Sequence, residues 1–216
     1  MNSWLLADDH VLVRAGLKAL LKEHFQTLDP RIGEVGSGEE AIDYAREHAP
    51  DLILMDLNMP GIGGMEACRR ILQTKPKTKI LVVTAVTRDP YPRRLIETGV
   101  HGYLTKFSPP EDLYEAVGKI LKGGRYVAAD VARQLALELA SHSEKSPLQM
   151  VTQREMQVLL MLARGESIRA ISDKLCLSPK TVATYRYRLY DKLGCANDVE
   201  LTRAAIRYGV VEIESE

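Results

Sequence analysis

Cysteine is scarce in this chain of 216 residues. The three cysteines, Cys68, Cys176 and Cys195, lie far apart and form no Cys-x-x-Cys pair. Small secreted domains, which depend on dense disulfide frameworks, have the opposite pattern. We therefore expect the protein to work in a reducing compartment.

Long apolar runs and a secretory leader are missing as well. No stretch reaches the roughly 18 apolar residues that a membrane-spanning helix needs. The N-terminal residues have no basic region before their short apolar run and no small-residue cleavage site. By elimination, we expect a cytoplasmic protein with no membrane partner.

The chain carries no net charge, because its 29 basic and 29 acidic residues cancel. Its overall charge therefore gives no argument for binding nucleic acid. Residues 164–192 differ, because they hold seven basic and three acidic side chains, a local net charge of +4. This segment is a candidate nucleic-acid contact, and charge alone indicates no more than that.

The length suits two domains, because single domains cluster at roughly 100–150 residues. Up to residue 127, short β-rich apolar runs alternate with amphipathic stretches, which is typical of a parallel α/β sheet. Two of the runs are apolar throughout and should be central strands. The five predicted strands span residues 4–7, 31–35, 52–55, 80–84 and 103–105.

Helix starts can be predicted in both halves of the chain. Ser108 is the predicted N-cap of the helix after the fifth strand, with Pro109 at the first helical position and Glu111 completing a capping box. From residue 151 onward strand signals vanish and four helical segments follow. Their predicted N-caps are Thr152 with Glu155, Ser167, Ser178 with Pro179, and Asn197.

These patterns predict a doubly wound, five-stranded parallel sheet in residues 1–122. Residues 123–149 are a predicted linker with a helix at 130–140, and its polar residues from 141 to 147 have nothing to bury. Residues 150–211 form the predicted small all-α domain, and 212–216 are an acidic tail.

Polar side chains stand where the predicted strands end. Asp8 and Asp9 follow the first strand, Asp56 follows the third, Thr84 ends the fourth, and Lys106 follows the fifth. Parallel α/β sheets bind ligands at the carboxyl ends of their strands, so these side chains should meet. Three crowded carboxylates repel one another unless a cation lies among them, and Mg²⁺ prefers such oxygen ligands.

This set of side chains fits phosphoryl transfer, in which a protein positions the phosphoryl group and compensates its charge. Asp56 is the predicted nucleophile. Lys106 would place a positive charge, and Thr84 a hydroxyl donor, on the phosphoryl oxygens. Each of these residues alone is more often a turn, a cap or a snorkelling lysine, and only the conjunction favours a site.

Residues 8–9, 56–61 (Asp-Leu-Asn-Met-Pro-Gly), 84–85 and 102–106 (Gly-Tyr-Leu-Thr-Lys) resemble the receiver domain of two-component response regulators over residues 1–122. The resemblance implies a flavodoxin-like fold and a phosphoacceptor aspartate. The metal ligands that it implies are Asp9, Asp56 and the backbone carbonyl of Asn58, with Asp8 acting through water. It also implies that Thr84 and Tyr103 move together as a switch after phosphorylation.

The helical segment at 178–193 is a candidate DNA-reading helix. At about 100° per residue its inward face carries Val182, Tyr185, Leu189 and Leu193. A short turn at Cys176 joins it to the preceding helix, as in a helix-turn-helix. The candidate DNA contacts are Lys180, Thr181, Ala183, Thr184, Tyr187, Arg188 and Lys192.

Residues 152–155, 171–182 and 188–194 resemble the LuxR-type helix-turn-helix. Together with the receiver this is similar to the NarL/FixJ class, and more narrowly to the GacA/UvrY/SirA/LetA group. The resemblance implies a sensor histidine kinase or phosphotransfer protein as phosphodonor and promoter DNA as target. It further implies control of small regulatory RNA genes whose products titrate CsrA-type repressors.

A single helix-turn-helix binds DNA weakly, so we expect phosphorylation to favour a homodimer on paired half-sites. Our hypothesis is that the unphosphorylated receiver occludes the reading helix, with the flexible stretch at 141–147 allowing release. We expect no enzyme that acts on a separate substrate, only magnesium-dependent self-phosphorylation and dephosphorylation.

Two alternatives remain open at this stage. A phosphatase of the haloacid dehalogenase type would need Asp-x-Asp, and Asn58 stands in place of its general acid. The other alternative is a relay whose helical domain binds protein, and steep salt dependence would distinguish DNA binding from it.

Overall fold

The computed structural model describes residues 2–85, 91–140, 147–208 and 210–211. The described residues form two compact units, one holding those up to residue 140 and the other those from 147 onward. Most of the polar stretch expected at 141–147, and the whole acidic tail at 212–216, lie outside them.

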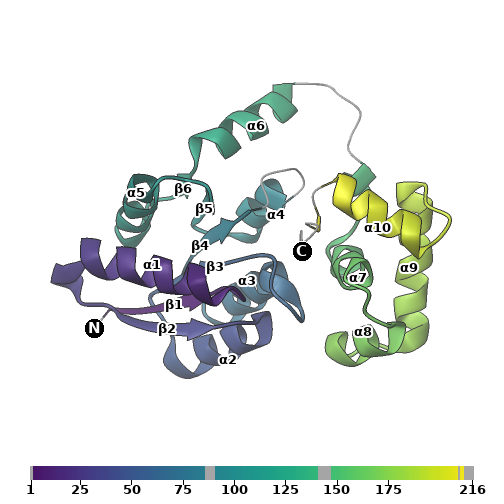
Figure 1. Ribbon diagram of the computed structural model, residues 1–216, viewed down its shortest axis with the longest axis horizontal. Coiled ribbons are helices and arrows are strands. Elements are labelled where there is room, and N and C mark those ends of the chain that lie inside the picture. The colour runs from purple at the N-terminus through teal and green to yellow at the C-terminus, as the bar shows by residue number, and fades with distance from the viewer. Residues whose placement is uncertain (1, 86–90, 141–146, 209, 212–216) are drawn as a thin grey trace. The chain divides into compact units, whose positions relative to one another are not determined.

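The first unit contains one parallel sheet of six strands in the order β2-β1-β3-β4-β5-β6 (Figure 1). The central strands β3 and β4 are buried almost from end to end. This confirms the predicted doubly wound fold. The strands are β1 (Ser3–Ala7), β2 (Arg31–Val35), β3 (Leu52–Met55), β4 (Lys79–Thr84), β5 (Gly102–Thr105) and β6 (Tyr126–Val127).

The five-strand prediction was one strand short. The sixth strand, β6, has only two residues and pairs with Gly102 and Tyr103 of β5. A two-residue strand shows no alternation of apolar and polar side chains, so periodicity could not reveal it.

The helices of the first unit group into two layers, because α1 packs with α5, whereas α2 packs with α3 and α3 with α4. A short 3₁₀ helix, Gln26–Leu28, follows α1. The helices are α1 (Val11–His24), α2 (Gly38–His48), α3 (Gly63–Thr74), α4 (Tyr91–Thr98), α5 (Pro110–Leu121) and α6 (Ala129–Ala140).

The predicted cap of α5 is wrong. The N-cap is Pro109, in extended conformation and with no side-chain cap, and the helix begins at Pro110. A residue that precedes proline is pushed out of the helical region, so Pro109 cannot be the first helical residue here. The hydroxyl of Ser108 instead bonds with that of Thr105 at 3.0 Å.

The second unit is all-α, as predicted, and each predicted N-cap is confirmed. Each capping side chain accepts a hydrogen bond from the backbone N–H three residues ahead, and Thr152 with Glu155 forms a full capping box. Its helices are α7 (Gln153–Ala163), α8 (Ile168–Leu175), α9 (Pro179–Leu193) and α10 (Asp198–Arg207), after the 3₁₀ helix Pro147–Met150.

The turn between α8 and α9 is short. Cys176 ends α8 in the left-handed region, with φ of 54°, and Ser178 already caps α9. Two helices joined in this way form a helix-turn-helix. Within the described residues, no helix combines the length and the apolar character that crossing a membrane requires.

Candidate functional site

The predicted pocket residues lie at the carboxyl edge of the sheet. Asp8 follows β1, Asp56 follows β3, Thr84 ends β4, and Lys106 follows β5. Asp8, Asp56 and Thr84 are buried, with at most 3% of their surface exposed. Since neighbouring parallel strands end at the same edge, residues far apart in the chain meet there.

Lys106 bridges two of these carboxylates. Its Nζ lies 2.7 Å from Oδ2 of Asp8 and 2.8 Å from Oδ2 of Asp56. Burial by itself would lower the pKa of Lys106, but the hydrogen bonds and charges of Asp56 and Asp8 outweigh it and raise that pKa. The ammonium is therefore charged at neutral pH and compensates part of the acidic charge.

The same edge has room for a metal ion. Asp8, Asp9, His10 and Asp56 each offer a ligand atom, and these atoms lie within 4.8 Å of one another. Three carboxylates against one ammonium leave a formal charge of −2, which a divalent cation neutralises. The carboxylate oxygens of the three aspartates fit Mg²⁺.

The loop after β3 folds back on Asp56. The backbone N–H of Asn58 points to Oδ1 of Asp56 at 3.3 Å, and Asn58 is half-buried. Gly61 and Gly63 both have positive φ, at 79° and 73°, which favours glycine at these two positions. The loop therefore turns tightly beside the carboxylate of Asp56.

Two contacts that hold this loop were missed from the sequence. The Oε1 atom of Glu39, in α2, accepts a hydrogen bond from the N–H of Ile62 at 3.1 Å. Gly64 lets the start of α3 pack directly on the backbone just after β3, because a Cβ there would overlap the carbonyl oxygen of Asp56. Nothing in the sequence around Glu39 indicates its contact with the loop. Gly63 and Gly64, side by side at the start of a helix, do indicate close packing.

The predicted switch residues lie on neighbouring strands. Thr84 pairs with Thr105, and Tyr103 pairs with Val82 two residues earlier in β4. Both Thr84 and Tyr103 are fully buried. The N–H of Lys106 donates to the carbonyl of Thr84 at 2.9 Å, so β4 and the lysine are directly joined.

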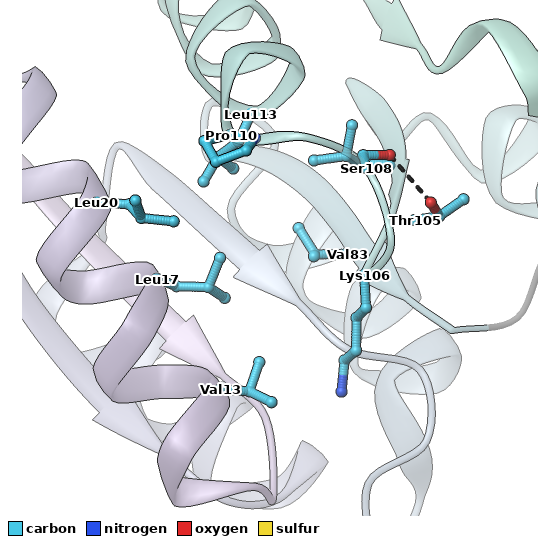
Figure 2. Close-up of a pocket in the computed structure, with 10 residues that line it drawn as sticks. Val13, Leu17, Leu20, Val83, Thr105, Lys106, Ser108, Pro110 and Leu113 are labelled. Atoms are coloured by element: carbon cyan, nitrogen blue, oxygen red, sulfur yellow. Dashed lines mark hydrogen bonds between the residues drawn. The ribbon is translucent and has the colours of Figure 1, made fainter.

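An apolar cavity of about 150 Å³ lies beside the pocket, between α1 and α5. Figure 2 shows Val13, Leu17 and Leu20 of α1 along one side, Val83 and Lys106 opposite them, and Pro110 and Leu113 at the top. Apart from Lys106, it has few polar groups. No carboxylate is among the described residues that line it, so the cavity is distinct from the acidic edge.

The candidate reading helix α9 has one inward and one outward face. Val182 and Leu189 are buried, and Tyr185 and Leu193 are half-buried. On the opposite face, the side chains exposed to solvent are Lys180, Thr184, Tyr187, Arg188 and Asp191.

Three of the candidate DNA contacts are less available than these. Thr181 is half-buried, and its hydroxyl bonds with that of Ser178 at 2.8 Å, within the cap. Ala183 is half-buried as well. Lys192 lies with its Nζ 2.6 Å from Oε2 of Glu155, which is 1% exposed, so its ammonium ties α9 to the start of α7.

The carboxylate of Glu155 is strongly held. Burial by itself would raise its pKa, but hydrogen bonds from Lys192 and Thr152 outweigh that effect and lower the pKa below its ordinary value. Glu155 therefore serves the capping box and the ion pair at once.

A cluster of Arg186, Tyr190 and Asp198 orients Tyr187, the exposed aromatic side chain of α9. The guanidinium of Arg186 lies 5.2 Å from the ring centre of Tyr187 and 5.9 Å from that of Tyr190. The hydroxyl of Tyr190 donates to Asp198 of α10 at 2.5 Å. Burial, followed by the hydrogen bond to Asp198, raises the pKa of Tyr190 to about 12. The cluster thus orients Tyr187 and joins α9 to α10.

A doubly wound sheet with carboxylates and a lysine at its carboxyl edge, followed by a helix-turn-helix, defines a receiver domain joined to a DNA-binding domain. Comparison with known families agrees. Residues 4–118 match the family described as "Response regulator receiver domain", and residues 149–205 match "Bacterial regulatory proteins, luxR family".

The chain also matches relatives over nearly their whole length. The chain is 43% identical to the response regulator GacA of Pseudomonas aeruginosa, over 98% of each chain. It is 42% identical to the response regulator UvrY of Escherichia coli, over 100% of this chain and 98% of that one.

Among solved structures, the chain is similar to the response regulator RcsB of Salmonella typhimurium. In one structure the TM-score is 0.74, with 25% identity over 94% of this chain and 96% of that one. A second solved structure, described as two RcsB dimers bound to two parallel DNAs, has a TM-score of 0.60, with 25% identity over 94% of this chain and 98% of that one.

The chain belongs to the LuxR-type response regulators of two-component systems. It is a DNA-binding transcription regulator and not a classical enzyme.

Proposed function

We propose that Asp56 accepts a phosphoryl group from a phosphohistidine of a sensor histidine kinase or phosphotransfer protein. The observation that carries the proposal is the joining of Asp56 and Asp8 by Lys106 at one edge of the sheet, at 2.8 and 2.7 Å. In the transfer, an oxygen of Asp56 bonds to phosphorus while the phosphorus–nitrogen bond of the donor breaks, and the imidazole leaves with its electron pair.

Mg²⁺ would be held by Asp9, Asp56 and the backbone carbonyl of Asn58, with Asp8 acting through water. When bound, the ion would act as a Lewis acid and neutralise charge on the phosphoryl oxygens. Lys106 would compensate the same charge, because its ammonium contacts Asp56 Oδ2. Thr84 donates its hydroxyl to a phosphoryl oxygen.

The acyl phosphate is retained as a signal and then lost by self-catalysed hydrolysis. Thr84 and Tyr103 change position together while Asp56 is phosphorylated. Their neighbouring places on β4 and β5, both fully buried, support such a coupled movement, because neither side chain can shift without its neighbours.

The second domain binds promoter DNA through α9 in the major groove. Lys180 and Arg188 contact phosphates, and Thr184 and Tyr187 contact base edges, which their exposure on one face supports. Thr181 and Ala183, which are half-buried at the edge of that face, also contact the DNA. A homodimer favoured by phosphorylation is supported by the similar RcsB, described as dimers bound to DNA.

The domain boundaries that we propose are 1–122 for the receiver, 123–149 for the linker, 150–211 for the DNA-binding domain and 212–216 for the tail. The family matches at 4–118 and 149–205 support the two domains. Because its target is chromosomal DNA, the protein acts in the cytoplasm.

The genes under control are, in this proposal, those of small regulatory RNAs that act on CsrA-type repressors. Full-length identity of 43% to GacA and 42% to UvrY supports this choice of target.

Phosphorylation control is tested by footprinting the promoters of such RNA genes with wild-type protein and Asp56→Asn, each with and without acetyl phosphate. We expect the phosphodonor to extend protection for wild type and not for Asp56→Asn. Asp43→Asn, an exposed carboxylate on α2, is the matched control and should respond like wild type. An identical response of Asp56→Asn would contradict the proposal.

A further inference from the structure

His10 lies directly beside the acidic edge. It is the N-cap of α1, but its side chain makes no capping hydrogen bond. Its Nδ1 lies 2.9 Å from Oδ1 of Asp9 and 3.2 Å from Oδ1 of Asp8. The backbone N–H of His10 also donates to Oδ1 of Asp8 at 2.9 Å, which fixes the histidine next to this carboxylate.

The pocket therefore has two sides. Lys106 contacts Oδ2 of Asp8 and Oδ2 of Asp56. His10 contacts the Oδ1 atoms of Asp8 and Asp9. A cation is repelled by the ammonium of Lys106, so it is favoured on the Oδ1 side, where the imidazole lies.

The distances fit a shared coordination sphere. Ligand atoms bound at about 2.1 Å and at right angles to one another lie about 3 Å apart. The separation of Nδ1 from Oδ1 of Asp9, a direct ligand in the metal site proposed above, is 2.9 Å and matches this spacing. The histidine side chain is 59% exposed, so its ring can adjust without unpacking the core.

Nitrogen and oxygen ligands select different metals. Mg²⁺ takes oxygen ligands, whereas imidazole suits first-row transition ions and carboxylates suit Mn²⁺. We propose that His10 supplies an Nδ1 ligand to the ion bound by the acidic edge, so that this side chain raises the affinity of the site for a divalent transition-metal ion such as Mn²⁺ but not its affinity for Mg²⁺. This inference rests on the metal site proposed above.

The nitrogen ligand can be detected directly in full-length protein loaded with Mn²⁺. Electron spin-echo envelope modulation should show the ¹⁴N couplings of a coordinated imidazole, and His10→Asn should lose them. His48→Asn, an exposed histidine on α2, is the matched control and should keep them. Bound Mn²⁺ without ¹⁴N coupling in wild type would overturn the role of His10.

Affinity gives the second measurement. Titration of free Mn²⁺ by its electron paramagnetic resonance signal should show that His10→Asn weakens binding by about tenfold. Competition with Mg²⁺ should show that His10→Asn changes the affinity for Mg²⁺ by less than about twofold, because Mg²⁺ does not need the nitrogen ligand. Equal weakening for both ions would overturn the proposal.

The metal site and the role of His10 fail in different ways. If wild-type protein bound no Mn²⁺, or if Asp9→Asn left Mn²⁺ binding unchanged, the metal site itself would be wrong. If Asp9→Asn abolished binding while His10→Asn changed neither affinity nor spectrum, only the assignment of His10 would be wrong. His10→Gln should repeat the result of His10→Asn, which separates the lost ligand from a local effect of asparagine.

Discussion

The ammonium of Lys106 lies 2.8 Å from Oδ2 of Asp56, although 50 residues separate them in the chain. The same ammonium contacts Asp8, so one positive charge stands between two buried negative ones. Removing it would leave these carboxylates to repel one another in a region of low dielectric.

We therefore predict that Lys106→Met lowers the melting temperature. Mg²⁺ should raise the melting temperature of Lys106→Met by more than it raises that of wild type, because the ion takes over the charge compensation. Scanning calorimetry with and without Mg²⁺ measures both effects. Lys77→Met, at an exposed site, is the control. Equal responses of Lys106→Met and wild type to Mg²⁺ would contradict the prediction.

Phosphoryl transfer should also slow in Lys106→Met. Removing a donor that faces developing charge typically slows a reaction by about a hundredfold or more. The rate of acyl phosphate formation from acetyl phosphate, followed by phosphate-affinity electrophoresis, measures this. An unchanged rate would mean that Lys106 serves only folding.

The Glu155–Lys192 pair should make the stability of the second domain depend on acid pH. The pKa of Glu155 is lowered in the folded state, so its contribution is complete above the ordinary value of 4.5 and is lost as pH falls through the folded pKa. Glu155→Gln keeps a capping acceptor but loses the charge, so it should cost about 2 kcal/mol at neutral pH. Urea unfolding at pH 7 and pH 4 measures this, and the loss should shrink at pH 4.

Substitutions of Arg188 and of Lys192 should have different effects on the salt dependence of DNA binding. Arg188→Met removes a proposed phosphate contact and should reduce the slope of log K against log salt by about one. Lys192→Met removes a side chain already paired with Glu155, so the slope should stay unchanged while the domain loses stability. Fluorescence anisotropy over a range of salt concentrations checks both, and a lower slope for Lys192→Met would place Lys192 at the DNA.

Alanine substitutions at Gly64 and at Gly118 should change the stability of the protein in opposite directions. A Cβ on Gly64 overlaps the carbonyl oxygen of Asp56, so Gly64→Ala should cost about 1–3 kcal/mol and disturb phosphorylation. Gly118, in α5, has nothing within 4 Å of an added Cβ, so Gly118→Ala should stabilise by about 0.5–1 kcal/mol. Chemical denaturation of both variants compares them.

The occlusion hypothesis stays a prediction. If the unphosphorylated receiver blocks the reading helix, residues 150–216 alone should bind a promoter fragment more tightly than unphosphorylated full-length protein, measured at equal salt. Equal affinity, or weaker binding by the fragment, would count against it.

Much of the fold and pocket could be predicted from sequence because the signals are local. Apolar runs predicted five strands, and since parallel strands end at one edge of a sheet, Asp8, Asp56, Thr84 and Lys106 could be expected to meet there. The four N-caps of the helical domain were equally readable, since a capping side chain acts on a backbone N–H only three residues away.

Only the tertiary structure decided the rest. The partner of Lys192 is a carboxylate 37 residues away, and Glu39 reaches the loop after β3 across 23 residues. The two-residue β6 exists because β5 offers it an edge, and Ser108 turns to Thr105 because two prolines follow. Even His10, which adjoins Asp9 in sequence, takes its place at the pocket from the bend at the start of α1. Local patterns determine which side chains are available, whereas packing determines which of them meet.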